Sequence, residues 1–298
     1  ETIDDPKYYN ILTAKQFNER MVIPYSPASL PEKIASIDDK LPTNFEKRPK
    51  VVGMILAHNV GSMLREAYNK IPKGILDEIY VMDNSTNDET YKIAKEMGLK
   101  VFRNTVRAGY GGNVKEGLLR GMEMGADYIV EIHGDGAQFH PKSVKYAFPY
   151  MEEGVDFILG SRFQNPRQAL KNGMPLIRYV ANRFLSFVDR AVLKLPFTEF
   201  HTGFRIYGKK FLKKVPFEEN SDDYLFSFQI IAQAAYCNAT TAEVPVEADY
   251  HGEHTSHRLS GAFLYALQTF KVLYEYILAK NFSKDRSIFT TVNISRSE

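Results

Sequence analysis

Residues 127–141 read Asp-Tyr-Ile-Val-Glu-Ile-His-Gly-Asp-Gly-Ala-Gln-Phe-His-Pro, and this stretch decides how the rest of the chain is interpreted. Residues 127–132 predict a short buried strand, because tyrosine, isoleucine and valine favour strands and the run is too short for a helix. The strand pattern breaks at Gly134, and Pro141 stands where proline commonly opens a new helix. The polar residues between them are therefore expected at the carboxyl end of a strand, the edge where open α/β sheets bind ligands.

Three polar side chains in this loop could hold a divalent cation. His133 offers a nitrogen, Asp135 a carboxylate oxygen and Gln138 an amide oxygen. Together they could bind Mg²⁺ or Mn²⁺ against a diphosphate. The alternative is a polar loop with a turn at Asp135, and these residues alone leave both interpretations open.

The composition of the chain indicates an ordinary globular protein. Of its 298 residues 44% are hydrophobic and 25% are charged, and the net charge of +2 does not indicate a nucleic-acid-binding surface. The only cysteine is Cys237, which excludes an internal disulfide and fits a reducing compartment. The sequence shows no signal peptide and no apolar run long enough to span a bilayer, so we expect a cytoplasmic protein.

Three regions are predicted along the chain. Residues 1–49 contain six prolines and predict an arm lying over the main domain, with a disordered leader as the alternative, and residues 281–298 predict a polar tail. Between them, residues 50–280 alternate strand and helix patterns, which indicates an α/β fold with a mostly parallel central sheet. Strands are predicted at 51–57, 76–82, 100–103, 127–132, 156–160 and 242–246, and a further strand is predicted to follow a polar turn at 201–205. Helices are predicted at 61–70, 89–97, from the glycine-rich turn to 124, 141–152, 176–195, 222–236 and 261–280.

Other polar residues lie near predicted strand ends. Asp83 could accept hydrogen bonds from a nucleobase or ribose, or it could merely cap the helix that follows. Residues 109–112 form a glycine-rich turn that could approach a phosphate or sugar at a helix N-terminus, although it matches neither a P-loop nor the Rossmann pattern. Arg162 and Arg205 suit bidentate phosphate binding, with surface ion pairs as the alternative.

Two further segments are predicted to be loops. Residues 164–175 contain two prolines and predict a mobile loop. Residues 251–258 contain three histidines, but their spacing matches no standard zinc pattern. A flexible loop that closes over a ligand is the favoured interpretation of this second segment.

The order of these motifs resembles the family-two glycosyltransferases of the GT-A fold, and most closely the dolichyl-phosphate mannose synthase-like branch. The resemblance covers about residues 50–280 and implies a Rossmann-like, three-layer αβα sandwich. It rests on Ala57-His58-Asn59, residues 81–90, residues 107–113, His133-Gly134-Asp135-Gly136-Ala137-Gln138, residues 160–163, residues 202–207 and Glu243-Val244-Pro245-Val246.

The resemblance implies roles for the positions that match the family's motifs. The implied donor-binding residues are Ala57, Asn59, Asp83, Arg107, Gly111, Gly134 and Asp135. The implied metal ligands are Asp135, Gln138 and His133. The implied catalytic residues are Asp135, Arg162 and Arg205, where the arginines would meet the acceptor phosphate or the departing nucleotide. The residues implied for the acceptor or the closing loop are His201, His254, Ser256 and Arg258.

Three departures from the family pattern concern the donor site. Val60 replaces the family's glutamate after Asn59, His133 replaces the first aspartate of the metal motif, and Ala137 resembles an insertion before Gln138. A His-Gly-Asp variant could still bind a cation through Asp135, with a preference for Mn²⁺, or it could weaken catalysis.

The implied activity is inverting transfer of a sugar from a GDP- or UDP-sugar, with a Mg or Mn ion as cofactor, to an acceptor. A polyprenyl phosphate at the membrane surface is the favoured acceptor. A hydroxyl acceptor would need a general base, for which His201 and Glu131 are the candidates. The alternatives are a nucleotidyltransferase and a catalytically weak nucleotide-sugar-binding protein. The helix predicted at 261–280 could lie on a membrane surface or pack into the core.

Overall fold

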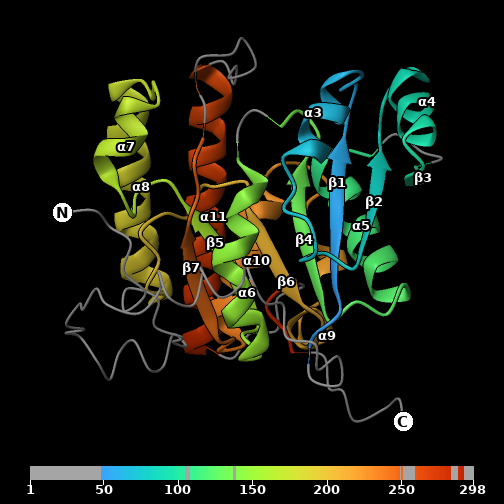
Figure 1. Ribbon diagram of the computed structural model, residues 1–298. Helices are drawn as coiled ribbons and strands as arrows, with labels where there is room; N and C mark the ends of the chain where they lie inside the picture. Colours follow the sequence, from blue (N-terminus) through green and yellow to red (C-terminus); the bar gives the residue numbers. More distant parts are fainter. Residues whose placement is uncertain are drawn as a thin grey trace.

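The computed structural model describes residues 48–104, 108–136, 139–248, 250, 259–282 and 288–291. Its centre is a seven-stranded sheet with the order β3-β2-β1-β4-β6-β5-β7 (Figure 1). Within this sheet, β6 runs antiparallel to its neighbours β4 and β5, while the other strand pairs are parallel. The prediction of a mostly parallel sheet is therefore confirmed. The strands are β1 (Val51–Ala57), β2 (Glu78–Asp83), β3 (Lys100–Arg103), β4 (Tyr128–His133), β5 (Phe157–Ser161), β6 (Arg205–Gly208) and β7 (Thr241–Pro245).

Helices cover both faces of the sheet, which confirms the predicted three-layer arrangement. One face is covered by α3 (Met63–Asn69), α4 (Glu89–Glu96) and α6 (Val144–Glu152), the last preceded by the short 3-10 helix η2 (Pro141–Ser143). The other face is covered by α5 (Tyr110–Glu123), α8 (Leu176–Leu193), α9 (Lys209–Lys214), η3 (Phe217–Glu219), α10 (Phe226–Tyr236) and α11 (Leu259–Phe282).

Strand β1 shows why both faces are covered. All seven of its residues are buried. Val52 and Met54 contribute to the core beneath α5 and α10, whereas Val51 and Ile55 contribute to the core beneath α3 and α6. Successive side chains of a strand point to opposite faces, so a continuous apolar run requires a helical layer on each side.

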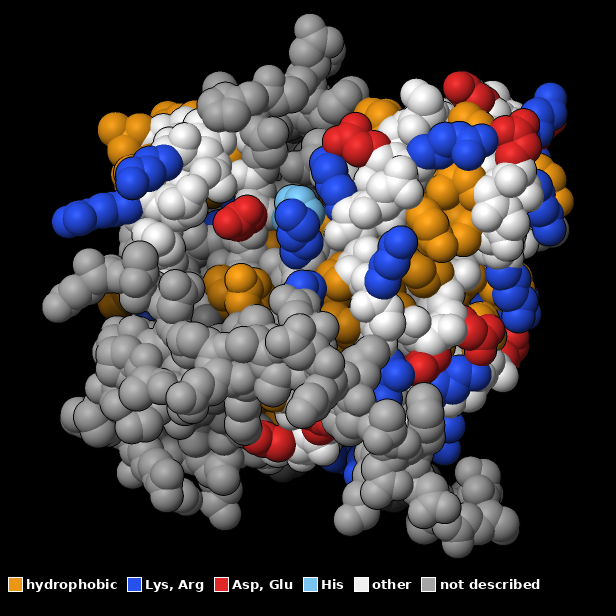
Figure 2. Space-filling model, viewed as in Figure 1, with side chains coloured by type: hydrophobic (Ala, Val, Ile, Leu, Met, Phe, Trp, Pro, Cys, Tyr) orange, Lys and Arg blue, Asp and Glu red, His pale blue; other side chains and the backbone are white. Residues whose placement is uncertain are grey.

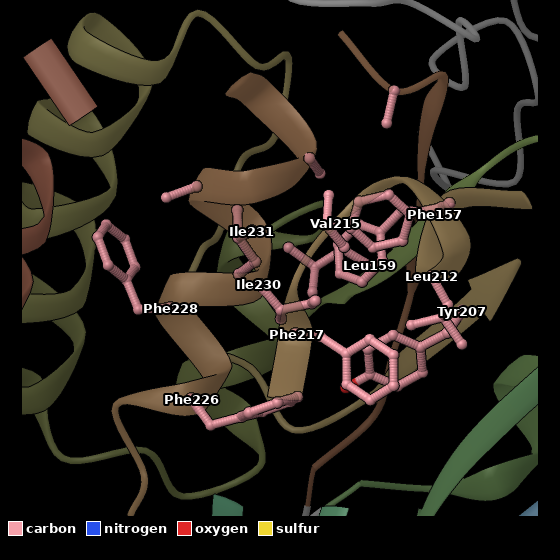
Figure 3. Close-up of a cluster of buried hydrophobic side chains, with 14 of the residues drawn as sticks. Phe157, Leu159, Tyr207, Leu212, Val215, Phe217, Phe226, Phe228, Ile230 and Ile231 are labelled. Atoms are coloured by element: carbon pink, nitrogen blue, oxygen red, sulfur yellow. The ribbon is translucent and has the colours of Figure 1, made fainter. Parts of the chain in front are cut away.

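The larger of the two cores lies between the sheet and α10. Figure 3 shows Phe157, Leu159 and Tyr207 of the sheet in one cluster with Ile230 and Ile231 of α10. Each of these side chains is less than one per cent exposed, and burying one large apolar side chain contributes about 1.5–3 kcal/mol. This packing holds β5 and β6 in place, and with them the ends of the segment that connects the two strands.

One predicted loop contains a helix, and one further helix was not predicted. The loop predicted at 164–175 contains helix α7 (Pro166–Lys171). It forms because Asn165 caps the helix, its side chain accepting the N–H of Gln168 at 3.2 Å, and because Pro166 occupies the first helical position. Helix α9 was not predicted. The arm predicted at 1–49 lies outside the described residues except for Arg48 and Pro49.

Helix α5 begins inside the glycine-rich stretch that was predicted as a turn. Gly109 is its N-cap, and the N–H of Gly112 donates to the carbonyl oxygen of Asp222 at 3.0 Å. A Cβ on Gly111 would lie 2.7 Å from the carbonyl oxygen of Asp223. These glycines therefore let α5 approach the backbone of residues 221–223 closely, a contact that the local sequence does not reveal.

Helix α11 packs one of its sides into the core, as one of the two interpretations of residues 261–280 expected. Leu273 and Tyr276 on one side of the helix are buried in the core, whereas Phe263 and Leu267 on another side are exposed. In the described part of the chain, no helix combines the length and the hydropathy needed to cross a bilayer.

We predict that Gly111→Ala destabilises the fold. The added methyl group would overlap the backbone of residues 221–223, which cannot yield as a flexible side chain can, and such overpacking costs about 1–3 kcal/mol. Urea unfolding measures the loss. The matched control is Gly261→Ala in α11, where nothing lies within 4 Å of the new Cβ. That variant should be neutral or more stable by up to about 1 kcal/mol. Equal stability of the two variants would contradict the proposed close approach.

Candidate functional site

The carboxyl ends of β1, β2 and β4 meet at one edge of the sheet. Ala57 pairs with Asp83 across β1 and β2, and Leu56 pairs with His133 across β1 and β4. The segments that follow these three strands are therefore neighbours, as the sequence predicted. This edge contains the described residues predicted for the donor and the metal ion, except Gly111, which faces residues 221–223. Arg107, Gln138, His254, Ser256 and Arg258 lie outside the described residues.

The loops after β1 and β2 are joined into one unit by hydrogen bonds. The N–H of Asn59 donates to the Ser85 hydroxyl at 2.8 Å, and the Asn59 side-chain oxygen accepts the N–H of Thr86 at 2.9 Å. Asn59 adopts a left-handed backbone with φ of 54°, a conformation that asparagine tolerates better than most residues. The backbone and side chain of Asn59 are thus held in place by the loop after β2.

Asp83 is the buried carboxylate of this corner. One oxygen accepts the N–H of Ser85 at 3.0 Å, and the other lies 3.5 Å from Arg103 Nε, buried and without a hydrogen-bond partner. The N-cap of helix α4 is Asp88, so Asp83 does not cap that helix. An incompletely satisfied buried carboxylate can accept a hydrogen bond from a ligand, which suits the predicted nucleoside contact.

His133 is the last residue of β4, and its ring is held by the protein. Its Nε2 lies 3.0 Å from the carbonyl oxygen of Gly203 and 3.6 Å from a carboxylate oxygen of Glu131. The ring stacks on that of Tyr110, with 6.1 Å between the ring centroids, and its centroid lies 5.6 Å from that of the Phe139 ring. Donation to the Gly203 carbonyl places the proton on Nε2, so only Nδ1 keeps a lone pair for a metal ion.

Asp135 is the half-buried carboxylate of the loop after β4. Gly136 follows it with a positive φ of 61° and packs closely on Ala67 of α3. Among the described residues no group of three histidine, cysteine, aspartate or glutamate side chains could together hold a metal ion. One carboxylate nevertheless fits Mg²⁺ or Mn²⁺, because these ions often take one or two protein carboxylates and complete their shell with substrate phosphates and water.

Glu131 forms a buried network with Arg205. One oxygen of the Glu131 carboxylate accepts from Tyr110 and from Arg205 at 3.1 Å, and the other accepts from Tyr207 at 2.5 Å. Burial alone would raise the pKa of Glu131, but Arg205 and hydrogen bonds from His133 and Tyr110 lower it from 4.5 to about 2. Glu131 is therefore ionised and fully engaged, which makes it a poor general base.

Arg162 forms a second buried network with Glu199. Its Nε donates to Glu199 at 2.8 Å, and its guanidinium also reaches the hydroxyl of Tyr250 at 2.5 Å and the carbonyl oxygen of His201 at 2.8 Å. Burial lowers the pKa of Arg162, but Glu199 outweighs it and keeps the guanidinium charged. Sequence reasoning missed Glu199 and did not predict the contact of Tyr250 with Arg162. Glu199 could have been noticed as the one charged residue of the stretch 195–200.

The side chain of His201 is 7% exposed. Its Nε2 lies 2.9 Å from a carboxylate oxygen of Asp189 on α8, in an approach not aligned as a hydrogen bond. Its Nδ1 lies 3.4 Å from the hydroxyl of Tyr265 on α11, and its ring stacks on Phe228 at 5.7 Å. The structure thus brings His201 close to Arg162 but engages its ring within the protein.

Comparison with known proteins identifies the family. Residues 54–216, more than half of the chain, match the model of Glycosyl transferase family 2. The chain belongs to this family. It is therefore a glycosyltransferase, and the sequence resemblance is confirmed.

Relatives of this glycosyltransferase include proteins with named substrates. The chain is 29% identical over 236 residues to an uncharacterised protein of Methanocaldococcus jannaschii, covering 79% of this chain and 94% of that protein. It is 26% identical over 249 residues to UDP-N-acetylglucosamine–dolichyl-phosphate N-acetylglucosaminyltransferase of Methanococcus voltae, covering 78% and 96%. It is 26% identical over 178 residues to undecaprenyl-phosphate mannosyltransferase of Micrococcus luteus, covering 57% and 70%.

A solved structure confirms the GT-A fold. Glucosyl-3-phosphoglycerate synthase of Mycobacterium tuberculosis, determined with Mn²⁺, UDP and glucosyl-3-phosphoglycerate, is similar with a TM-score of 0.57. The match covers 85% of each chain at 16% sequence identity. At this identity the likeness establishes the architecture of this glycosyltransferase.

We predict that Glu131→Gln destabilises the protein and reduces its acid sensitivity. At neutral pH the loss should be about 3–5 kcal/mol, because Arg205 is left buried without its charged partner. The lowered pKa of Glu131 means that its carboxylate stabilises the fold above pH 4.5 and that this contribution disappears as the pH falls toward 2. The free energy of unfolding, measured by urea at several pH values, should therefore vary less across this window in the variant.

The control for that experiment is Glu152→Gln, which removes an exposed carboxylate of α6. It should leave both the stability and the acid sensitivity of the wild-type protein in place. An unchanged acid profile in Glu131→Gln would show that the buried ion pair is not the acid-sensitive element.

Proposed function

We propose that this glycosyltransferase moves a sugar from a UDP-sugar to a polyprenyl phosphate with inversion at the anomeric carbon, and that it binds a divalent cation through Asp135. The observation that supports the donor half is the position of Asp83 and Asp135 at the carboxyl ends of β2 and β4, the two strands that flank β1. A UDP-sugar is favoured over a GDP-sugar because the Methanococcus voltae relative is named for UDP-N-acetylglucosamine.

Asp83 and the joined loops after β1 and β2 would bind the nucleoside. The buried oxygen of Asp83 that lacks a hydrogen-bond partner would accept from the base or the ribose. Ala57 and Asn59 would form the adjacent wall, since Asn59 is fixed by Ser85 and Thr86. The backbone of Gly134 is held by a hydrogen bond of 2.9 Å to the Leu56 carbonyl, which places Asp135 next to this pocket.

Asp135 would hold the cation, and His133 could contribute only Nδ1. A divalent cation, when bound, offsets the charge that develops on a leaving diphosphate. The preference for Mn²⁺ inferred from the sequence fits a nitrogen ligand beside a carboxylate. The ring of His133 is held against the rings of Tyr110 and Phe139. Asp135 would therefore contribute more than His133 to binding the cation.

The choice of a phosphate acceptor is supported by the fact that both candidate general bases are engaged within the protein. Glu131 has both oxygens occupied and a pKa of about 2, and His201 is enclosed by Asp189, Tyr265 and Phe228. An acceptor phosphate is already ionised at neutral pH and can attack the anomeric carbon without a base, whereas a hydroxyl needs one. The names of two relatives, for dolichyl and undecaprenyl phosphates, support the same choice.

Arg162 and Arg205 would act by fixing the segment between β5 and β6. Arg162 is 8% exposed and Arg205 is 3% exposed. The guanidinium group of Arg162 is paired with Glu199, and that of Arg205 is paired with Glu131. Arg205 also donates to the carbonyl oxygen of Thr202. The predicted direct contact with phosphate would require one of these pairs to open, so we propose that both are positioning residues for the segment 199–203. Peripheral association with a membrane follows from a lipid acceptor and is part of this proposal.

We predict that Asp135→Asn separates metal-dependent from metal-independent binding. Calorimetry on the wild-type protein should show that UDP binds more tightly with Mn²⁺ than without it, and that GDP binds more weakly. In Asp135→Asn the effect of Mn²⁺ should disappear, and sugar transfer should fall by about a hundredfold to a thousandfold, the scale of losing one transition-state charge contact.

The exposed Glu152→Gln variant should behave as the wild-type protein in these assays. Undiminished transfer by folded Asp135→Asn would remove Asp135 from the metal site. A folded wild-type protein that binds neither diphosphate would contradict the donor assignment.

We predict that the enzyme distinguishes a polyprenyl phosphate from the matching polyprenol. With one chain length and one UDP-sugar, the alcohol should react at least about a hundredfold more slowly, because general-base catalysis is worth about 10²–10⁴ and neither candidate base is available. Comparable rates would favour a hydroxyl acceptor and would point to a base that the described residues do not show.

A further inference from the structure

Helix α8 turns polar side chains to the interior and large apolar side chains to the outside over much of its length. Its buried residues are Ser186, Asp189 and, at its end, Leu193, whereas Ile177 is 73% exposed and Phe187 is 70% exposed. Surface helices normally turn their apolar stripe to the core. The outward stripe recurs at helical spacing and consists of Leu176, Ile177, Val180, Phe184 and Phe187.

Helix α11 carries a second outward stripe. Its residues 259–270 contain no charged side chain, and within this segment Thr269 is buried while Phe263 and Leu267 are exposed. The exposed large side chains of this stripe are Phe263, Leu264, Leu267, Phe270, Tyr274 and Ile277. Helices α8 and α11 pack against each other and lie side by side in Figure 1. We call the two stripes together the apolar face.

The exposed apolar residues are concentrated on this face rather than scattered. Fourteen large hydrophobic side chains are exposed in the described part of the chain, and all except Tyr224 belong to α7, α8 or α11. Single exposed hydrophobic residues are ordinary, but a contiguous group of this size marks an interaction surface.

The charge beside the apolar face is strongly basic. Residues 166–194 contain six lysines and arginines. Four of them are exposed, namely Arg167, Lys171, Arg183 and Lys194, while Arg178 and Arg190 are half-buried. The one acidic residue of this range, Asp189, is buried beside His201. Figure 2 shows hydrophobic side chains next to lysine or arginine side chains at its upper left edge, over α7 and α8. A second copy of the chain meeting this face symmetrically would oppose like charges, whereas anionic lipid headgroups would be attracted.

The apolar face begins next to the proposed acceptor side of the site. Arg178 near the start of α8 lies over the ring of Tyr250, 5.8 Å from its centroid, and the hydroxyl of Tyr250 contacts Arg162. Tyr265 near the start of α11 contacts His201. Both helices therefore carry their apolar stripes up to the edge of the sheet where the site lies.

We propose that α8 and α11 dock the enzyme on an anionic lipid bilayer, lying along the interface with the apolar face in contact with the acyl chains. An amphipathic helix with basic flanks binds a membrane surface in this manner. The proposal deepens the proposed function, on which its purpose rests: docking would hold the site at the level of lipid headgroups, where a polyprenyl phosphate carries its phosphate.

The test is flotation of the full chain with vesicles, in the absence of any substrate. Vesicles of phosphatidylcholine alone are compared with vesicles that also contain phosphatidylglycerol. The wild-type protein should float with the mixed vesicles and less with phosphatidylcholine alone. The double variant Phe184→Glu with Phe187→Glu changes only exposed positions, and its vesicle partition coefficient should fall about tenfold or more.

The matched control is Lys92→Glu on α4, an exposed position at the opposite flank of the sheet. It changes the net charge by the same two units but leaves the apolar face intact, so it should float as the wild-type protein does. Circular dichroism confirms that each variant is folded.

Several outcomes would overturn the proposal. They are a wild-type protein that floats with neither vesicle, a double variant that floats like the wild-type protein, and a control that loses binding equally. A wild-type dimer in light scattering that the double variant converts to a monomer would assign the face to a second copy. Because flotation needs no turnover, a failure of the proposed sugar transfer would leave it unaffected. If both proposals hold, the double variant should lose activity on polyprenyl phosphate in vesicles and keep UDP binding.

Discussion

The buried ion pair between Glu131 and Arg205 sets the arrangement of the site. The two residues face each other in the β4–β6 register, and the carboxylate could not remain ionised there without a charged partner. Tyr110 and Tyr207 complete the shell around Glu131. Because β6 runs antiparallel to β4, its amino end lies at the carboxyl ends of the parallel strands. The segment before β6 therefore lies at the edge where β1, β2 and β4 end.

The proposed acceptor side of the site is built on this segment. The carbonyl of Gly203 fixes the ring of His133, and Glu199 in the same segment pairs with Arg162. Glu243 on β7 anchors the start of the segment by accepting the N–H of Thr198 at 2.7 Å and that of Glu199 at 3.1 Å; burial raises the pKa of Glu243 to about 7. The ionisable groups described on this side are thus committed to holding backbone in place, which suits chemistry that needs no general base.

Helix α8 links the site to the surface of the protein. Ser186 accepts the N–H of Phe200 at 3.3 Å, and Asp189 lies against His201. Ser186 and Asp189 of α8 face inward to support this segment, and the apolar stripe that begins at Leu176 lies on the opposite side of the helix. One helix therefore supports the candidate site and presents the apolar face. Helix α11 extends the same face while its Leu273 and Tyr276 remain in the core.

Local patterns in the sequence determined the strands, most helices, the three-layer fold and the edge at which Asp83 and Asp135 lie, because burial on both faces of a strand and turn chemistry are written in neighbouring residues. The tertiary structure alone decided the rest. The glycines at the start of α5 serve close packing on residues 221–223, and the two arginines expected at phosphates are paired with carboxylates 74 and 37 residues away in sequence. The direction of β6 and the outward side of α8 were likewise hidden. Each of these depends on a partner distant in sequence, and no local pattern specifies which distant residue will be buried against it.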